Sequence, residues 1–126
     1  MSYINNTIFK KNSSQLVAAV DLGSNSFHLL IGKIERTDKG FEIISIDNLK
    51  EPVKLAIGLD EHKILDNESK FRAILALERF GERLRSLSPD LVRVVATNTF
   101  RIAKNGKTLL KKCEESIGFP IEVISG

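Results

Sequence analysis

Residues 21–26 combine a carboxylate with glycine, hydroxyl and amide side chains, a composition suited to binding phosphate. Asp21 closes an apolar run, and after Leu22 the chain continues with Gly23, Ser24, Asn25 and Ser26. Gly23 would let the backbone turn with a positive φ and approach a ligand closely. In such a bend successive backbone N–H groups form a concavity that binds anions, and the hydroxyl and amide groups add donors. Asp21 would hold Mg²⁺ beside the phosphate, mainly through water. The same residue types also make ordinary turns, and composition leaves that alternative open.

A second group of polar residues follows another apolar segment. Residues 91–96 are rich in β-branched side chains and lead directly into residues 97–101, Thr-Asn-Thr-Phe-Arg. Open α/β sheets bind ligands at the carboxyl ends of their strands, so this loop is the second place where we expect a ligand. From Arg101 to Lys112 the chain has five basic residues and no acidic one, which would raise the local concentration of anions. Solvated lysines on a helix face are the alternative interpretation.

The elements that would position these groups begin with three strands and a helix. Residues 16–20 are an unbroken apolar run, and residues 27–35 and 41–48 alternate apolar with polar side chains, which predicts three antiparallel strands. A helix should begin at Asp66 or Asn67, either of which can cap it, and it should bury one apolar face. That face is expected to contain Phe71, Ile74, Leu75, Phe80, Leu84 and Leu87.

The second half of the chain repeats a strand and helix pattern. We expect a strand at residues 91–96, then a helix that Asn105 caps and that ends at Gly118, and a final strand at residues 121–124. The predicted order is therefore β-β-β-α-β-α-β. A meander followed by crossover connections favours an α/β fold, a mixed sheet with helices on its faces.

Length and composition are those of one globular domain. The chain has 126 residues, of which 42% are hydrophobic and 28% charged, and no apolar run is long enough to span a membrane. The 19 Lys and Arg residues against 16 Asp and Glu residues are too small an excess to indicate nucleic-acid binding. The single cysteine, Cys113, is expected to fill the core, and the absence of a second cysteine favours a reducing cytoplasm. Residues 1–14 are polar, and we expect a flexible lead-in there.

Residues 18–28, Ala-Ala-Val-Asp-Leu-Gly-Ser-Asn-Ser-Phe-His, resemble the first phosphate motif of the exopolyphosphatase and guanosine pentaphosphate phosphatase family. The Asp-x-Gly-Ser core is shared by the wider superfamily of actin, sugar kinases and heat-shock chaperones. The extension Ser-Asn-Ser-Phe-His is more particular to the phosphatases. The resemblance extends from about Val17 to Gly126, and it implies that residues 15–126 form the first half of an actin-like, ribonuclease-H-like domain.

The resemblance also implies a reaction and a set of site residues. Family members release terminal phosphate from polyphosphate or from guanosine pentaphosphate, which requires neutralised charge, a positioned water and usually a metal. On this sequence Asp21 would organise Mg²⁺ or its water, and residues 23–26 would cradle the phosphate. In the family's second conserved loop Arg101 would bind phosphate through its planar fork, with Thr97 and Asn98 beside it. A homodimeric full-length protein is implied as well.

The sequence departs from the family at its end. Family members continue past Ile-Ser-Gly (residues 124–126) with an acidic helical segment, which contains the glutamate taken as the catalytic base, and with a later glycine-rich phosphate motif. We therefore expect a fragment with an incomplete catalytic apparatus. A kinase of the same superfamily and a nucleotide-dependent scaffold are the alternatives, and the choice between polyphosphate and guanosine pentaphosphate stays open. His28 lies among alternating apolar residues, and we expect it to be structural.

Overall fold

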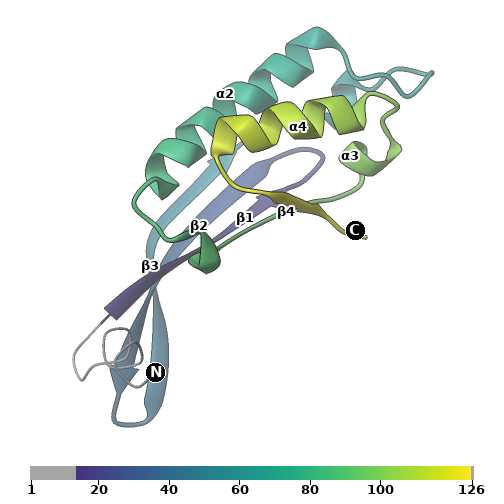
Figure 1. Ribbon diagram of the computed structural model, residues 1–126. Helices are drawn as coiled ribbons and strands as arrows, with labels where there is room; N and C mark the ends of the chain where they lie inside the picture. Colours follow the sequence, from purple (N-terminus) through teal and green to yellow (C-terminus); the bar gives the residue numbers. More distant parts are fainter. Residues whose placement is uncertain (1–13, 126) are drawn as a thin grey trace.

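The computed structural model describes residues 14–125, which form a mixed sheet with two long helices against one face (Figure 1). The strands are β1 (Ser14–Leu22), β2 (Phe27–Thr37), β3 (Gly40–Glu51), β4 (Val92–Ala96) and β5 (Ile121–Val123). The helices are α2 (Asn67–Leu84), α3 (Thr99–Ile102) and α4 (Gly106–Ile117), with short 3-10 helices η1 (Ala56–Gly58) and η2 (Pro89–Leu91). The expected lead-in lies outside the described residues, apart from Ser14, which begins β1.

The sheet has the strand order β3-β2-β1-β4-β5. The first three strands form an antiparallel meander, and β4 and β5 then run parallel to β1 on its other side. The long helices α2 and α4 precede β4 and β5, as crossover connections between parallel strands require. The predicted element order and the α/β mixed sheet are confirmed, and α2 and α4 lie on the same face of that sheet (Figure 1).

Strands β1 and β2 form a hairpin that sends alternate residues to opposite faces. Its last register pair is Leu22 with Phe27, so residues 23–26 make the connection. One face joins the core beneath the helices, and from this hairpin it contains Ala18, Val20, Leu22, Phe27, Leu29 and Ile31. The other face is not covered by a helix of the described chain, and Asp21, His28 and Leu30 are exposed there. Because the period of a strand is two, burying Leu22 turns Asp21 away from the core.

Helix α2 begins where the sequence predicts, and its buried face agrees with the predicted one at Phe80 and Leu84 but not throughout. Asp66 is the N-cap, and its carboxylate accepts a hydrogen bond of 2.7 Å from the backbone N–H of Ser69. The predicted face is wrong at Phe71 and Leu75, whose side chains are 61% and 37% exposed. The buried residues are Ser69, Ala73, Ala76, Leu77, Phe80 and Leu84. Small side chains at three of these positions let the helix approach its neighbours closely, and Phe71 and Leu75 are turned outward.

Helix α4 is held at both ends by residues that the sequence singled out. Asn105 is its N-cap, but its side chain does not cap the helix; instead the amide exchanges hydrogen bonds of 3.0 and 3.1 Å with the backbone of Leu65. Gly118 ends the helix in the left-handed conformation, with a φ of 85°, as predicted. Cys113 is buried in the core, also as predicted, and burial raises the pKa of its thiol to about 12. No helix in the described part of the chain is long and apolar enough to cross a membrane.

The orientation of α2 can be tested by comparing two phenylalanines on that helix. Phe80 is fully buried whereas Phe71 is 61% exposed. We expect Phe80→Ala to lower the free energy of unfolding by about 3–5 kcal/mol, because it removes a packed side chain and leaves a cavity. Phe71→Ala should change it by less than about 0.5 kcal/mol. Urea denaturation of both variants measures the difference, and equal losses would contradict the assigned face.

Candidate functional site

The connection between β1 and β2 is a compact bend closed by its own backbone. The N–H of Gly23 donates a hydrogen bond of 3.1 Å to the carbonyl of Ser26. The prediction of a positive φ at Gly23 is wrong, because among the described glycines only Gly40 and Gly118 have one. A side chain at Gly23 would be crowded for another reason, since a Cβ there would lie 3.0 Å from the Ser26 carbonyl oxygen. The glycine therefore allows a close backbone approach.

The carbonyl groups of the bend are held by the segment that follows β3. The N–H of Lys54 donates to the carbonyl of Asn25 at 2.8 Å, and the N–H of Ala56 donates to the carbonyl of Ser24 at 3.0 Å. All peptide bonds of the described chain are trans, and in a trans peptide the C=O of one residue points opposite to the N–H of the next. The N–H groups of Asn25 and Ser26 are therefore directed away from the supporting segment.

These N–H groups are available for a ligand. Within residues 14–125, the backbone N–H groups of Ser24, Asn25 and Ser26 have no hydrogen-bond acceptor. Adjacent backbone N–H groups in a bend form an anion-binding concavity, because each carries a partial positive charge at a fixed position. The free N–H groups are compatible with the phosphate binding predicted for residues 23–26, which stays a prediction.

The loop after β4 lies against this bend, as the topology requires of neighbouring parallel strands. The N–H of Thr97 donates to the carbonyl of Leu22 at 3.3 Å, which ties the end of β4 to the end of β1. The hydroxyl of Thr99 is 2% exposed and donates to the hydroxyl oxygen of Ser24 at 2.8 Å. Thr99 was not among the predicted site residues. The sequence offered a signal in the polar run 97–99, but burial of one hydroxyl could not be inferred from it.

Arg101 and Asn98 are exposed at the edge of the same loop. Arg101 lies on the single turn α3, and its guanidinium forms no ion pair with the described residues. Asn98 has a φ of 33°, and its carbonyl accepts bonds from the N–H groups of Arg101 and Ile102. The structure thus joins Thr97 to the end of β1, whereas no hydrogen bond within residues 14–125 links Asn98 to the bend, and the Arg101 side chain has no partner among the described residues.

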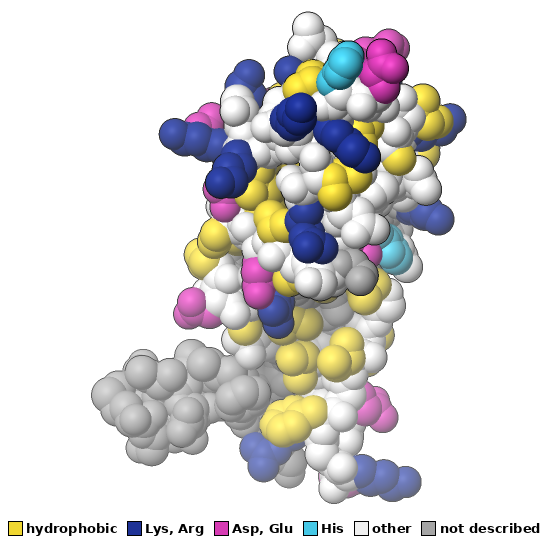
Figure 2. All heavy atoms as spheres, turned by 90° about the vertical axis from the view of Figure 1, so that its right-hand side faces the viewer, with side chains coloured by type: hydrophobic (Ala, Val, Ile, Leu, Met, Phe, Trp, Pro, Cys, Tyr) yellow, Lys and Arg dark blue, Asp and Glu magenta, His cyan; other side chains and the backbone are white. Residues whose placement is uncertain are grey.

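Basic side chains gather around this end of the sheet. Figure 2 views the molecule from the side of α3 and the chain end, and Lys and Arg side chains are grouped on its upper part. All five basic residues of the segment 101–112 are exposed. Lys104 also donates its backbone N–H to the carbonyl of Lys63, which joins the loop before α2 to the start of α4. The positive charge would attract an anion carrying several phosphates.

Asp21 lies on the face of the sheet that the helices leave uncovered. It lines a hollow of about 440 Å³ together with Ala19, Val20, His28, Leu30, Arg93, Val95 and Ile124. Its carboxylate has no hydrogen bond or ion pair with any described residue. Its register partner His28 is exposed and bonds through Nε2 to the side-chain oxygen of Asn48, so this histidine is satisfied on the surface of the sheet.

Asp21 is a carboxylate that a metal could use, but it stands alone. No group of three or more Asp, Glu, His or Cys side chains that could hold a metal occurs in the part of the chain that the structure describes. Mg²⁺ commonly keeps several waters and binds through one or two carboxylates plus phosphate oxygens of the substrate. The single free carboxylate near the bend at residues 23–26 fits that mode and does not fit an all-protein metal cage.

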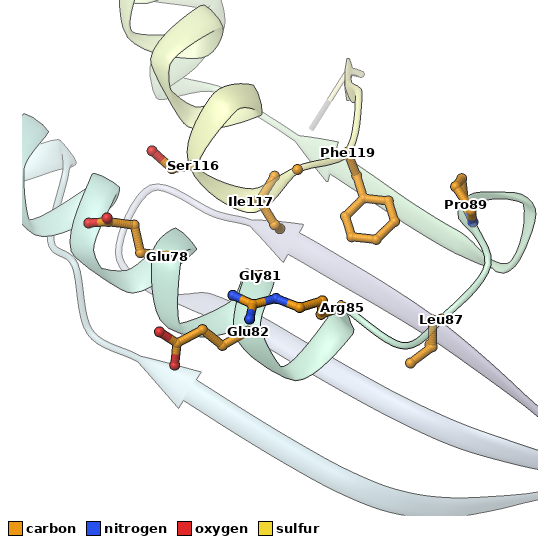
Figure 3. A pocket seen from close by; sticks show the side chains of 10 residues that line it. Glu78, Gly81, Glu82, Arg85, Leu87, Pro89, Ser116, Ile117 and Phe119 are labelled. Atoms are coloured by element: carbon orange, nitrogen blue, oxygen red, sulfur yellow. The ribbon is translucent and has the colours of Figure 1, made fainter.

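A larger cavity of about 530 Å³ lies elsewhere, between the ends of α2 and α4 (Figure 3). It is lined by Glu78, Gly81, Glu82, Arg85, Leu87, Pro89, Ser116, Ile117, Gly118 and Phe119. Leu87 and Pro89 precede β4 and Phe119 precedes β5, so the cavity is at the amino ends of the parallel strands. The two glutamates would repel phosphate, and the cavity is not part of the candidate site.

The strand order, the crossover helices and the polar loops at the carboxyl ends of β1 and β4 define a ribonuclease-H-like half-domain of the actin type. The sequence profile of the Ppx/GppA phosphatase family matches residues 33–126. The chain belongs to this family, as its sequence motif predicted.

Related proteins agree with the assignment. The chain is 43% identical over 117 residues to the guanosine-5'-triphosphate,3'-diphosphate pyrophosphatase of Pseudoalteromonas atlantica, covering 93% of this chain and 22% of that protein. Its fold is similar to the crystal structure of the Aquifex aeolicus Ppx/GppA family member, with a TM-score of 0.76 and 26% identity over 90% of this chain and 36% of the other. An exopolyphosphatase from Cytophaga hutchinsonii gives a TM-score of 0.74 and 25% identity, covering 89% and 35%. The chain thus spans about a fifth of the curated relative and about a third of each solved structure.

The link between the two loops predicts a loss of stability on changing Thr99. Thr99→Val keeps the shape of the side chain but removes the buried hydroxyl, so the free energy of unfolding should fall by about 1 kcal/mol. Thr108→Val is the matched control, because Thr108 is exposed on α4 and makes no side-chain hydrogen bond to a described residue. Chemical denaturation of both variants compares them. A Thr99→Val protein as stable as the control would mean that the hydroxyl pair does not join the loops.

Proposed function

We propose that residues 15–126 are the phosphate-binding half-domain of a phosphohydrolase that releases terminal phosphate from polyphosphate or from guanosine pentaphosphate. The observation that carries the proposal is the bend at residues 23–26, in which the free N–H groups of Asn25 and Ser26 are directed away from the segment that holds the Ser24 and Asn25 carbonyls. Phosphoryl transfer is catalysed largely by positioning and by stabilising negative charge, and fixed N–H groups supply both. Membership of the Ppx/GppA family supports the reaction class.

Each candidate residue has a separate part in this proposal. The N–H groups of Ser24, Asn25 and Ser26 bind the oxygens of the terminal phosphate, and the Ser24 hydroxyl, held by Thr99, is oriented toward the same ligand. Arg101 binds two phosphate oxygens with its planar guanidinium, a geometry that a lysine cannot reproduce. Thr97 and Asn98 shape the loop that carries Arg101. The basic residues around α3 and α4 attract the polyanion.

Asp21 is the residue that would hold Mg²⁺. Its carboxylate is exposed, unpaired among the described residues, and adjacent in sequence to the bend. A bound Mg²⁺ would neutralise charge on the phosphate oxygens during transfer. The metal itself is part of the proposal, since the family membership supports a divalent ion only in general terms.

The rest of the catalytic apparatus belongs to other parts of such an enzyme. The relative from Pseudoalteromonas atlantica is named as a pyrophosphatase acting on guanosine-5'-triphosphate,3'-diphosphate, and the chain spans 22% of it. We propose that the glutamate acting as catalytic base, and the residues that choose between the two substrates, lie in that remainder. A homodimer and a cytoplasmic location stay predictions, because no contact among the described residues bears on either.

The proposal is tested by assaying a full-length protein that contains this chain. Phosphate release is measured with polyphosphate, guanosine pentaphosphate and ATP, each with Mg²⁺ present. We expect release from one or both of the first two substrates. Transfer from ATP to an acceptor would favour a kinase, and nucleotide binding without turnover would favour a scaffold.

Replacing Asp21 tests its part in the reaction. Asp21→Asn keeps the size of the side chain and removes the charge, so turnover should fall by at least about 100-fold while the fold stays intact. Asp90→Asn is the matched control, because Asp90 is an exposed aspartate before β4, at the other end of that strand. Steady-state phosphate release and circular dichroism are measured for both. If Asp21→Asn turns over as fast as Asp90→Asn, Asp21 has no part in the reaction.

A further inference from the structure

Arg72 differs in its partners from the other arginines on the same helix. Arg79 and Arg83 pair with the carboxylates of Glu51 and Asp47 on β3. Arg72 instead donates from Nε to the carbonyl of Val53 at 2.9 Å and from a terminal nitrogen to the carbonyl of Lys54 at 3.5 Å. Its nearest carboxylate, Glu68, is 3.8 Å away and 85% exposed, so that ion pair is weak. The guanidinium therefore serves mainly to hold backbone carbonyls.

The carbonyls that Arg72 holds belong to the segment that supports the phosphate-binding bend. Val53 and Leu55 are buried, whereas Lys54 between them has a φ of 53° in the left-handed region, which lysine seldom adopts. A residue keeps such a conformation only where its surroundings fix it on several sides. Here the N–H of Lys54 is bonded to the Asn25 carbonyl on one side, and the Val53 and Lys54 carbonyls are bonded to Arg72 on the other.

The first turn of α2 holds the guanidinium of Arg72 in place. Ser69 is fully buried, and its hydroxyl accepts a bond of 3.0 Å from Arg72. Gly58 lies directly over Ser69, because a Cβ on Gly58 would come within 1.8 Å of the Ser69 oxygen. The hydroxyl and the N–H of Ser69 also lower the pKa of the capping carboxyl of Asp66. Arg72 is thus fixed to a rigid helix end.

We propose that Arg72 is a positioning residue for phosphate binding, acting through the backbone of residues 53–56. It holds the Val53 and Lys54 carbonyls, and this places the N–H groups of Lys54 and Ala56 where they bind the carbonyls of Asn25 and Ser24. The N–H groups of the bend are thereby kept aimed at the ligand before it arrives, which removes a cost of reorganisation during the reaction. This inference rests on the proposed function, since it assigns a supporting residue to the same phosphate site.

The test compares Arg72→Gln, Arg72→Lys and Arg79→Gln in a full-length protein containing this chain. We expect Arg72→Gln to lower kcat/KM for polyphosphate or guanosine pentaphosphate by about 10- to 100-fold, because a small displacement of binding groups is costly. Arg72→Lys, which can still donate to one carbonyl, should recover part of that loss. Arg79→Gln should stay near the wild type, because the hydrogen bond of Arg79 goes to the carboxylate of Glu51 on β3 and not to a backbone carbonyl of the segment 53–56.

A second readout separates positioning from general destabilisation. For Arg72→Gln and Arg79→Gln, both the melting temperature and the affinity for inorganic phosphate are measured. The affinity is obtained from product inhibition. The inference is supported if phosphate inhibits Arg72→Gln more weakly than it inhibits Arg79→Gln and the wild type. Inhibition of Arg72→Lys should then lie between that of Arg72→Gln and that of the wild type. Wild-type kinetics in Arg72→Gln, or equal losses of kcat/KM in Arg72→Gln and Arg79→Gln, would overturn it. A wild-type protein that releases no phosphate would instead overturn the proposed function, and this inference with it.

Discussion

Two hydrogen bonds between backbone groups determine the form of the candidate site. The N–H groups of Lys54 and Ala56 bind the carbonyls of Asn25 and Ser24. Because the peptide bond is planar and trans, fixing these two carbonyls also fixes the direction of the N–H groups of Ser26 and Asn25. Side chains contribute less to this direction than the backbone does. Glycine at position 23 suits the tight bend, because a Cβ there would crowd the Ser26 carbonyl, and the hydrogen bond between the hydroxyls of Ser24 and Thr99 joins the bend to the next loop.

The sheet explains why these loops meet. β1 lies between β2 and β4, antiparallel to one and parallel to the other, so the β1–β2 turn and the loop after β4 are at the same end. The helices α2 and α4 return the chain to the opposite end before each parallel strand. Polar groups at the carboxyl ends of neighbouring strands are therefore brought together by topology, although Ser24 and Thr99 are 75 positions apart in sequence.

Local patterns were sufficient to predict the order of the strands and long helices and to single out residues 21–26 as a candidate site. The apolar run before Asp21, the turn residues after it and the alternation after Phe27 predicted the hairpin. Residue type also indicated Gly118 at the end of α4 and Asp66 as one of two candidate caps of α2. The face of α2 was predicted wrongly in part because the pattern was read from large apolar residues. Close packing against neighbouring elements instead buried Ser69, Ala73 and Ala76, and the sequence of one helix does not show which small residues its neighbours will cover.

Contacts between residues distant in the chain could not be predicted from the sequence. Nothing in the residue types around Arg72 distinguishes it from Arg79, and only the fold places one beside backbone carbonyls and the other beside a carboxylate. The conformation of Gly23 was also predicted wrongly, because a composition typical of tight turns does not specify which φ the glycine adopts. Burial of the Thr99 hydroxyl depends on the parallel pairing of β1 with β4.

The central claim is that backbone N–H groups of the bend bind phosphate, and amide chemical shifts test it directly. Inorganic phosphate, and separately tripolyphosphate, would be added to the ¹⁵N-labelled protein while its amide resonances are followed. The structure predicts that the amides of Asn25 and Ser26 shift most, because they point away from the segment that holds the bend and have no acceptor among the described residues. Unchanged resonances for these two amides at saturating tripolyphosphate, with the largest shifts at Glu78, Glu82 or Arg85, would contradict the account.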